Sequence, residues 1–283
     1  MKKYVLLFLT VFCLVHMSYA QEMISIGTKH RIFSSGLNEE REYWVYLPPS
    51  YDAAETPDKN YPVIYLIDGE MYFHALTAIH CTYSRGRMPM MPECIVIGVV
   101  NTDRTRDLTP TRSAYDRNGQ LREDGQTSGG GGEQFLAYLT DELRPAIDET
   151  FRSNGENFLL GHSYGGLFTL HTMTYHTDAF DKYIALDPSL WWDNAALAQV
   201  CSDRYAEMDF TGKELYIGVA TKPRPGRETI HRGTLGGYVG KTIPQAIQNG
   251  LVFHYKEFPE DTHGTLPMPG FMDAFKAVFD ENQ

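Results

Sequence analysis

The sequence predicts an α/β protein with a mostly parallel central sheet flanked by helices. Continuous runs of Val, Ile and Leu recur along the chain, as is typical of strands that are buried on both faces. Between runs, apolar residues recur at the three- and four-residue spacing of amphipathic helices. A third observation is a glycine-flanked serine at 161–165, between a predicted strand and a predicted helix. Such alternation of strands and helices favours the α/β class.

The first predicted strand, at 41–47, alternates polar and apolar residues and should be half-buried, with Tyr43, Val45 and Leu47 on one side. The other strands are expected at 62–67, 94–100, 157–160, 183–186, 215–220 and 251–255. The runs at 62–67 and 94–100 are continuously apolar, which indicates the interior of a sheet, whereas His254 alternates with apolar residues in the last strand.

Helices are predicted after several of these strands. The segment 133–151 has one apolar face, and Pro145 within it predicts a kink or a break. A short helix is expected at 166–170, and a closing helix at 269–280 has phenylalanines at i, i+4 and i+8. The polar segment 104–126 is expected to be a loop that covers the carboxyl end of the sheet.

Residues 1–20 have the features of a signal peptide, and residues 21–283 are predicted to form a single domain. Lys2 and Lys3 precede an apolar run at 5–15, and Ser18-Tyr19-Ala20 favours cleavage before Gln21. The run is too short for a stable membrane anchor, and no other stretch has the length and apolarity of one. We therefore expect a periplasmic or secreted protein with no membrane association after signal removal. A lipoprotein signal at Cys13 is less favoured, because small residues do not precede it.

Charge and cysteine content narrow the possible partners. The net charge is −11, and removal of the leader would make it −13, which disfavours nucleic acid and anionic membranes as partners.

Cys81, Cys94 and Cys201 remain after cleavage, so at least one thiol is free. A Cys81–Cys94 disulfide is left open, and no spacing typical of a zinc site is present.

The segment Gly161–Gly165 fits G-x-S-x-G, the nucleophile elbow of serine hydrolases. The pattern alone is weak, but an elbow needs a strand before the serine and a helix after it, and both are predicted here. Gly161 and Gly165 lack the side chains that would keep strand and helix apart. Ser163 is therefore the candidate nucleophile, and the alternative is a glycine-rich turn with a capping serine.

A serine nucleophile needs a base, and an acid to orient that base. His263 follows the last predicted strand, 100 residues after Ser163, and is the predicted base; His231 is its competitor. The acid is expected between them in the chain. Glu228, after the 215–220 strand, is the first choice. Asp187 and then Asp193 are the alternatives, and a Ser–His dyad remains open.

The oxyanion of an acyl-transfer intermediate needs two backbone N–H donors. Tyr164, directly after the nucleophile, should supply one. The second is expected from the loop after the 62–67 strand, at Glu70 within 69–71.

These motifs together resemble the putative-esterase family of α/β hydrolases, which includes esterase D, feruloyl esterases and enterobactin-type trilactone esterases. The resemblance spans most of the chain after the leader and rests on segments at 63–69, 135–145, 159–168, 187–192 and 262–264. It implies an α/β-hydrolase fold, a serine acyl-enzyme with Ser163 and His263, no metal and no organic cofactor. It also implies that Trp191 and Trp192 line the substrate cleft.

The chain departs from the family pattern at two positions. Relatives usually carry the acid close behind the strand at 215–220, whereas residues 221–227 here separate that strand from Glu228. Asp187 stands where relatives often have serine, so it is a possible relocated acid.

The sequence thus predicts an exported serine esterase that acts on a small-molecule or oligosaccharide ester. Acylated carbohydrates, feruloyl-type esters and siderophore trilactones are the substrate classes considered. An acyltransferase with the same Ser–His machinery and a non-catalytic binding protein on a hydrolase scaffold are the alternatives. The oligomeric state is not predicted.

Overall fold

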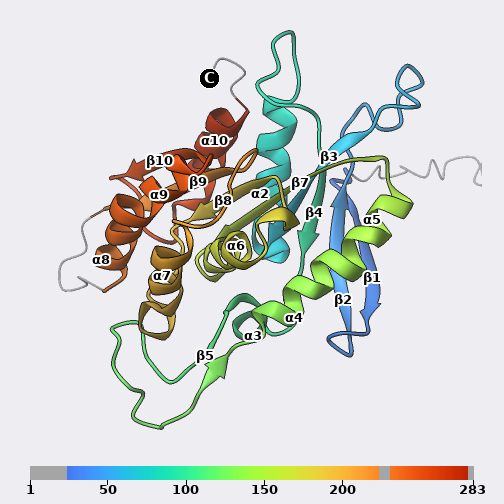
Figure 1. The fold of residues 1–283 in the computed structure, drawn as a ribbon. Coiled ribbons are helices and arrows are strands. Elements are labelled where there is room, and N and C mark those ends of the chain that lie inside the picture. Colours follow the sequence, from blue (N-terminus) through green and yellow to red (C-terminus); the bar gives the residue numbers. More distant parts are fainter. Residues whose placement is uncertain (1–23, 223–229, 280–283) are drawn as a thin grey trace, which may run out of the picture.

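The computed structural model describes residues 24–222 and 230–279 of the 283-residue chain. Within them, eight strands form one sheet in the order β1-β2-β4-β3-β7-β8-β9-β10 (Figure 1). The strands are β1 (Thr28–Ser34), β2 (Glu39–Tyr46), β3 (Tyr61–Ile67), β4 (Ile95–Val99), β7 (Ser153–His162), β8 (Lys182–Leu186), β9 (Glu214–Ala220) and β10 (Val252–Phe258). The pairs β1/β2 and β2/β4 are antiparallel, and the other pairs are parallel.

Helices cover both faces of the sheet, with α2 on one side and α6 on the other (Figure 1). The α-helices are α2 (Gly69–Tyr83), α3 (Arg104–Leu108), α4 (Gly132–Ala137), α5 (Arg144–Thr150), α6 (Tyr164–Tyr175), α7 (Trp192–Arg204), α8 (Ile230–Gly237), α9 (Ile243–Gln248) and α10 (Pro267–Val278). Shorter turns are η1 (Tyr138–Leu143), η2 (Thr177–Ala179) and η3 (Tyr238–Thr242).

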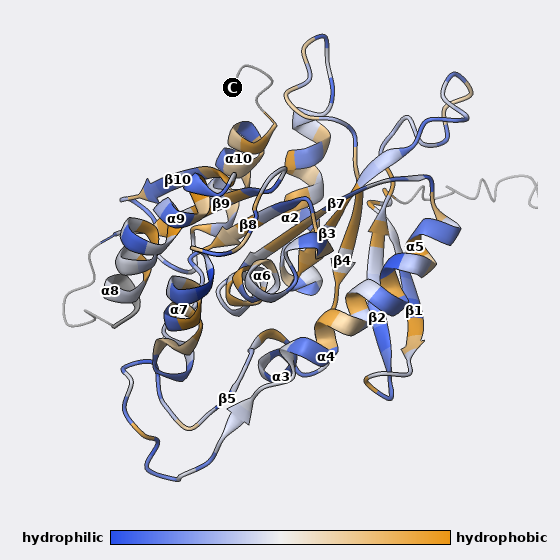
Figure 2. Ribbon diagram, in the orientation of Figure 1, coloured by the Kyte–Doolittle hydropathy of each residue, from blue (hydrophilic) through white to orange (hydrophobic). Residues whose placement is uncertain are grey.

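Two hydrophobic cores hold these layers together. One core joins the sheet to α4, η1, α5, α6, α7, α8, η3 and α9, and the other joins its opposite face to α2 and α10. The central strands β3, β4 and β8 are therefore buried throughout or nearly so, while the edge strand β10 is mostly exposed and hydrophilic (Figure 2). This arrangement is the one expected for parallel strands that are covered on both faces.

The predicted α/β class with a mostly parallel sheet is confirmed, and each predicted strand is present within a few residues. The 133–151 segment stays helical but widens into the π-helical turn η1, and Pro145 lies just after that turn, at the start of α5. The closing helix is α10, which begins two residues earlier than predicted. Leu47, expected on the buried side of a strand, lies just beyond β2.

The segment 104–126 is not wholly a loop. It begins with α3, and a two-stranded ribbon of β5 (Arg112–Ser113) and β6 (Ser128–Gly129) closes the loop that projects from the body of the molecule (Figure 1). Cys81, Cys94 and Cys201 are free thiols, so the possible Cys81–Cys94 disulfide is not formed. Across the described ranges, no helix has the length and apolarity needed to cross a bilayer.

Candidate active site

Ser163 lies on the sharp turn between β7 and α6. Its φ of 61° and ψ of −116° are strained for a residue with a side chain. A Cβ atom at Gly161 would lie 2.2 Å from the backbone of Gly165, so the chain can turn this tightly only because position 161 is glycine. The turn projects the Ser163 side chain from the carboxyl end of the sheet, and this is the strand–turn–helix setting that an elbow requires.

The side chains of Ser163, His263 and Asp187 form a continuous hydrogen-bonded chain. The Oγ of Ser163 lies 2.9 Å from Nε2 of His263, and Nδ1 of the same ring lies 2.5 Å from Oδ2 of Asp187. His263 is 41% exposed at its side chain, whereas Asp187 is 5% exposed. A buried carboxylate on Nδ1 places the N–H there and leaves Nε2 free to accept the serine proton.

Backbone hydrogen bonds between neighbouring strands place the serine and the carboxylate at the same edge of the sheet. Ser163 N–H donates to the carbonyl of Leu186 at 2.9 Å, and Asp187 N–H donates to the carbonyl of Gly218 at 2.7 Å. Asp187 directly follows β8 and adopts a positive φ of 42°, which turns the chain at the end of the strand. Nucleophile and carboxylate therefore come from neighbouring parallel strands.

The other residues considered for the base and the acid are either outside the described side chains or in other contacts. Glu228, the first choice for the acid, lies outside the described residues. Asp193 lies at the start of α7 and has a φ of 52°. His231 belongs to α8, and the structure describes only its backbone. His254, a strand residue, bonds Glu214 at the opposite end of the sheet.

The turn after β3 is held by a buried carboxylate. Asp68 is fully buried, has a φ of 59°, and receives two hydrogen bonds from Arg104, at 2.6 and 2.9 Å. Asn101, just after β4, donates to the same carboxylate at 2.7 Å. A Cβ at Gly69 would lie 2.5 Å from the backbone of Gly98, so α2 must begin with glycine to pack here.

The first turns of α2 and α6 meet beside Ser163. A Cβ at Gly165 would lie 3.4 Å from Oδ2 of Asp68, and the Arg104 guanidinium lies 5.2 Å from the centre of the Tyr164 ring. Tyr164 and Glu70 are the first residue of α6 and the second of α2, where N–H groups have no partner within the helix. Both predicted oxyanion donors thus lie at adjoining helix N-termini, which favour negative charge.

The two tryptophans differ in position. Trp191 is half-buried, and its ring centre lies 5.9 Å from that of Tyr164. Trp192 is 1% exposed, and its indole N–H donates to the carbonyl of Thr111 at 3.0 Å. The prediction that Trp192 lines the cleft is therefore wrong, because α7 begins with this side chain turned into the core.

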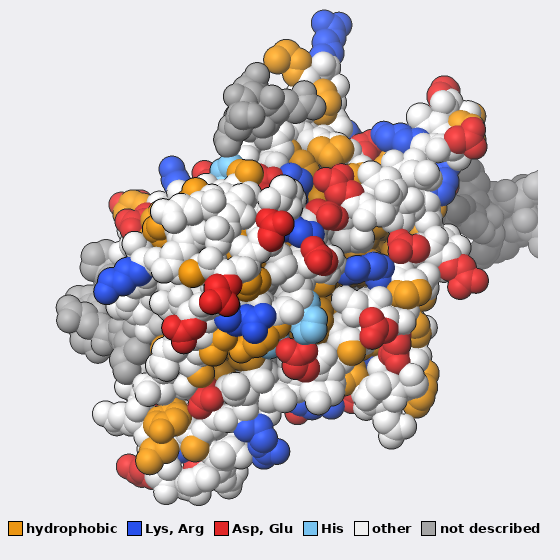
Figure 3. Space-filling view, in the orientation of Figure 1, with side chains coloured by type: hydrophobic (Ala, Val, Ile, Leu, Met, Phe, Trp, Pro, Cys, Tyr) orange, Lys and Arg blue, Asp and Glu red, His pale blue; other side chains and the backbone are white. Residues whose placement is uncertain are grey.

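Tyr164 lies next to one guanidinium, because Arg104 is 5.2 Å from the centre of its ring. Burial raises the pKa of the Tyr164 hydroxyl, and the positive charges of Arg104, Arg122 and Arg117 act against that rise. Arg104 also bonds the buried carboxylate of Asp68, so its charge is balanced locally. On the face shown in Figure 3, acidic, basic and hydrophobic side chains are interspersed.

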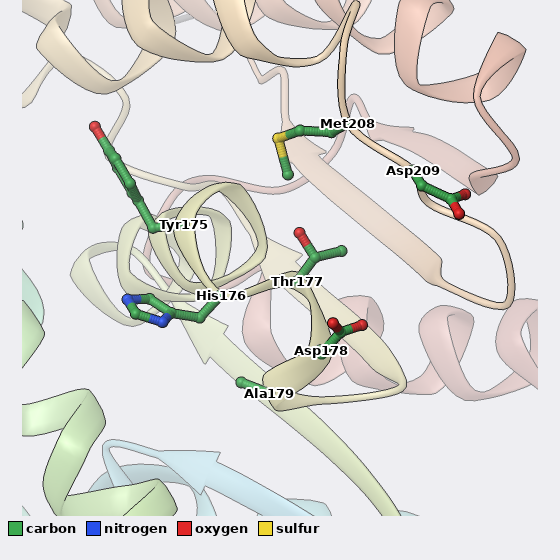
Figure 4. A pocket seen from close by; sticks show the side chains of 7 residues that line it. All are labelled: Tyr175, His176, Thr177, Asp178, Ala179, Met208 and Asp209. Carbon is green, nitrogen blue, oxygen red and sulfur yellow. The ribbon is translucent and has the colours of Figure 1, made fainter.

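A separate hollow lies at the far end of α6, roughly 18 Å from the elbow at the usual helical rise. It measures about 490 Å³ and brings together side chains from the end of α6, η2 and the segment before β9 (Figure 4). Its lining residues are Tyr175, His176, Thr177, Asp178, Ala179, Met208 and Asp209. None of them belongs to the predicted site. Among the described side chains, no group of three His, Cys, Asp or Glu residues is placed to hold a metal ion.

Comparison with known proteins places this geometry in a family. Residues 34–241 match the family model described as "Putative esterase". An IroE-like serine hydrolase from Shewanella oneidensis has a TM-score of 0.82 and 34% identity, with 89% of this chain and 80% of that chain covered. This likeness confirms the α/β-hydrolase fold.

The names of two curated relatives refer to siderophores. Ferri-bacillibactin esterase BesA from Bacillus subtilis is 31% identical over 179 residues, which cover 59% of this chain and 60% of the relative. Siderophore enterobactin esterase from Emericella nidulans is 31% identical over 159 residues, or 52% of each chain. The matched part thus spans between half and three fifths of the length of these relatives.

Proposed function

Because this chain belongs to the putative esterase family, we propose that it is a serine esterase that hydrolyses carboxylic esters. The observation that carries the proposal is the chain of short contacts from Ser163 through His263 to Asp187. In this assignment Ser163 is the nucleophile, His263 the general base and Asp187 the acid. Asp187, the second choice on sequence grounds, takes the acid's role in place of Glu228.

The geometry supports the following sequence of steps. His263 Nε2 takes the proton from Ser163 as Oγ attacks the ester carbonyl, and Asp187 stabilises the imidazolium that forms. The backbone N–H groups of Tyr164 and Glu70 are the proposed donors to the oxyanion of the tetrahedral intermediate. His263 then gives the proton to the leaving alkoxide. The same groups activate water to hydrolyse the acyl-enzyme.

We propose a siderophore lactone or a related anionic ester as the substrate class. The names of the curated relatives support this class. The positive charges of Arg122 and Arg117, which act on the Tyr164 hydroxyl, would attract the negative charge of catecholate groups and their ferric complexes. The half-buried Trp191 can pack against an aromatic ring of such a ligand.

Replacing the nucleophile tests the activity. Ser163→Ala should lower kcat on an activated short-chain ester by at least about 10⁴-fold, since the triad acts as a unit. The matched control is Ser153→Ala, at the opposite end of the same strand, which should keep the wild-type rate. When enterobactin is the substrate, chromatography and mass spectrometry should show linear products with the wild type and with Ser153→Ala, but not with Ser163→Ala. Full activity of Ser163→Ala would end the assignment.

We also propose that the protein acts outside the cytoplasm. The support is the sequence pattern of residues 1–20, which lie outside the described residues. Expression with the native leader, followed by N-terminal sequencing of the exported product, should give a chain that begins at Gln21. A product that retains Met1 and stays in the cytoplasm would overturn this part of the proposal.

A further inference from the structure

The residue before the nucleophile lies against the face of the proposed base. His162 ends β7 and is 4% exposed, and its ring centre lies 4.4 Å from that of His263, with the planes tilted by 40°. The contact is at the short end of the range for packed aromatic rings. One side of the His263 ring is therefore backed by a second imidazole.

A tyrosine from the other helix of the site holds His162 in turn. The hydroxyl of Tyr72, in α2, lies 3.0 Å from Nδ1 of His162, and the two rings meet edge to face. Tyr72 also contacts Phe271 of α10, which follows the His263 loop. Tyr72 lies two residues after Glu70. Its bond to His162 therefore connects the helix turn that carries the proposed oxyanion donor to the packed rings of His162 and His263.

The environment of His162 keeps its ring uncharged at neutral pH. Burial lowers the pKa of His162 to about 4, and the charge of His263 acts in the same direction. Asp187 and Asp68 act in the opposite direction but do not outweigh burial. Burial likewise raises the pKa of Tyr72 to about 12, so its phenol keeps its proton. An uncharged His162 does not repel the imidazolium that His263 becomes during turnover.

We propose that His162 is a positioning residue, which holds the His263 imidazole between Ser163 and Asp187 by ring contact and is itself oriented by Tyr72. This inference rests on the proposed function and extends it to a residue that touches neither substrate nor reacting atoms. The physical reason is that His263 lies in a loop and is partly exposed, so its two short hydrogen bonds need support from behind. Displacement of a catalytic group by about 1 Å costs on the order of 100-fold in rate.

Two substitutions at position 162 separate a ring-contact role from a hydrogen-bonding role. His162→Ala removes the supporting ring and should lower kcat by about 10- to 100-fold with KM changed by less than about 3-fold. Because water then reaches the imidazolium that forms during turnover, the acid limb of the kcat profile should also move relative to the wild type. His162→Phe keeps a flat buried ring and should recover most of kcat and the wild-type limb.

Tyr72→Phe tests whether Tyr72 orients His162, because it removes only the hydroxyl that bonds His162. A loss of kcat of about 3- to 10-fold is expected, with little change in KM.

The matched control for His162→Ala is His171→Ala. His171 is another buried histidine whose pKa is lowered by burial, but its ring packs on Tyr175, on the helix that follows the elbow. This control should leave kcat and the acid limb unchanged.

A spectroscopic readout keeps the test independent of turnover. The proton on Nδ1 of His263, in its short bond to Asp187, should give a strongly downfield proton resonance in the wild type and in His162→Phe. It should broaden or disappear in folded His162→Ala. If the wild type hydrolysed no ester, the proposed function would fail while this comparison still tested the positioning role.

Three results would overturn the inference. The first is a folded His162→Ala with wild-type kcat, acid limb and downfield resonance. The second is a folded His162→Phe as impaired as His162→Ala, which would reject ring contact as the cause. The third is Tyr72→Phe indistinguishable from wild type, which would remove Tyr72 from the arrangement. If His162→Ala does not fold, the second variant and Tyr72→Phe decide the matter, each against the wild type and by the same resonance.

Discussion

Histidine and carboxylate pair at both ends of the central sheet, with similar geometry. At the carboxyl end, His263 lies 2.5 Å from Asp187, and at the amino end His254 lies 2.7 Å from Glu214. The difference is in the third partner. His263 presents its other nitrogen to the hydroxyl of Ser163, whereas Glu214 is also bonded by the ammonium of Lys182.

A histidine–carboxylate contact alone therefore does not indicate catalysis. The pair at the carboxyl end lies beside a strained serine and two helix N-termini, so charge that develops on a substrate meets donors there. The pair at the amino end neutralises charge where strands β8, β9 and β10 begin. Position in the sheet, together with a nucleophile, distinguishes a site from a structural ion pair.

Isosteric replacement of the proposed acid, beside the same change at Glu228, gives the sharpest test of the carboxyl-end pair. Asp187→Asn should lower kcat by about 10³- to 10⁴-fold with little change in KM, because an amide favours the wrong tautomer of His263. Steady-state kinetics on an activated ester measure it. Glu228→Gln should stay within a few-fold of wild type. A larger loss in Glu228→Gln than in Asp187→Asn would return the acid's role to Glu228.

The turn after β3 should matter next. Arg104→Gln leaves the buried carboxylate of Asp68 without its bidentate partner, so the N–H groups at the start of α2 should lose their fixed position. We expect kcat to fall by about 10- to 100-fold. Arg106→Gln is the matched control, because Arg106 bonds Glu39 and Asp107 from the same short helix. It should lower thermal stability without lowering kcat, and equal losses of kcat would contradict the role of the turn.

The positive charges that act on Tyr164 should affect binding more than chemistry. Joint replacement of Arg117 and Arg122 by Gln should raise KM for an anionic siderophore lactone by about 3- to 10-fold, since a charge that stays in contact with solvent contributes on the order of 1 kcal/mol or less. KM for a neutral activated ester should not change. A rise in ionic strength should raise KM for the anionic lactone more in the wild type than in the variant. Equal effects on both esters would argue against an anionic substrate.

At the amino end, Glu214→Gln should leave kcat unchanged and lower stability by about 1–3 kcal/mol. Burial alone would raise the pKa of Glu214, but hydrogen bonds from His254 and Lys182 outweigh it and hold the pKa below its usual value. The lowered pKa stabilises the fold above about pH 4.3 and the benefit is lost as pH falls through the folded-state pKa. Urea unfolding measured from pH 7 to pH 3 should therefore show that the difference in free energy of unfolding between wild type and variant becomes smaller as the pH falls. A difference that does not change with pH would contradict this account.

Much of the fold was predictable, because interior strands carry a strong signal. The continuous apolar runs at β3, β4, β8 and β9 predict buried strands, and β7 with its glycines predicts the elbow. Strand β1 was missed because it is an edge strand, rich in charged residues and largely exposed. A kink or break at Pro145 was predicted, but the π-helical turn before it was not, since that depends on how the segment packs.

The side chains of the proposed site could be anticipated where they follow chain order and not where they depend on register. Ser163 and His263 could be proposed from order along the chain. The pairing of Asp187 with His263 depends on how far β8 extends beside β7 and how sharply the chain turns after it, which spacing does not encode. His162, Tyr72 and Arg104 gave no recognisable pattern, because their roles come from contacts between segments 36 to 101 residues apart.

The proposed supply of the acid by the residue after β8 has a consequence for how this sequence can diversify. In this assignment adjacent strands fix both the nucleophile and the carboxylate, so the connection from β9 to α8 carries no residue of the triad. Sequence changes in that connection would then escape the selection that preserves a triad residue.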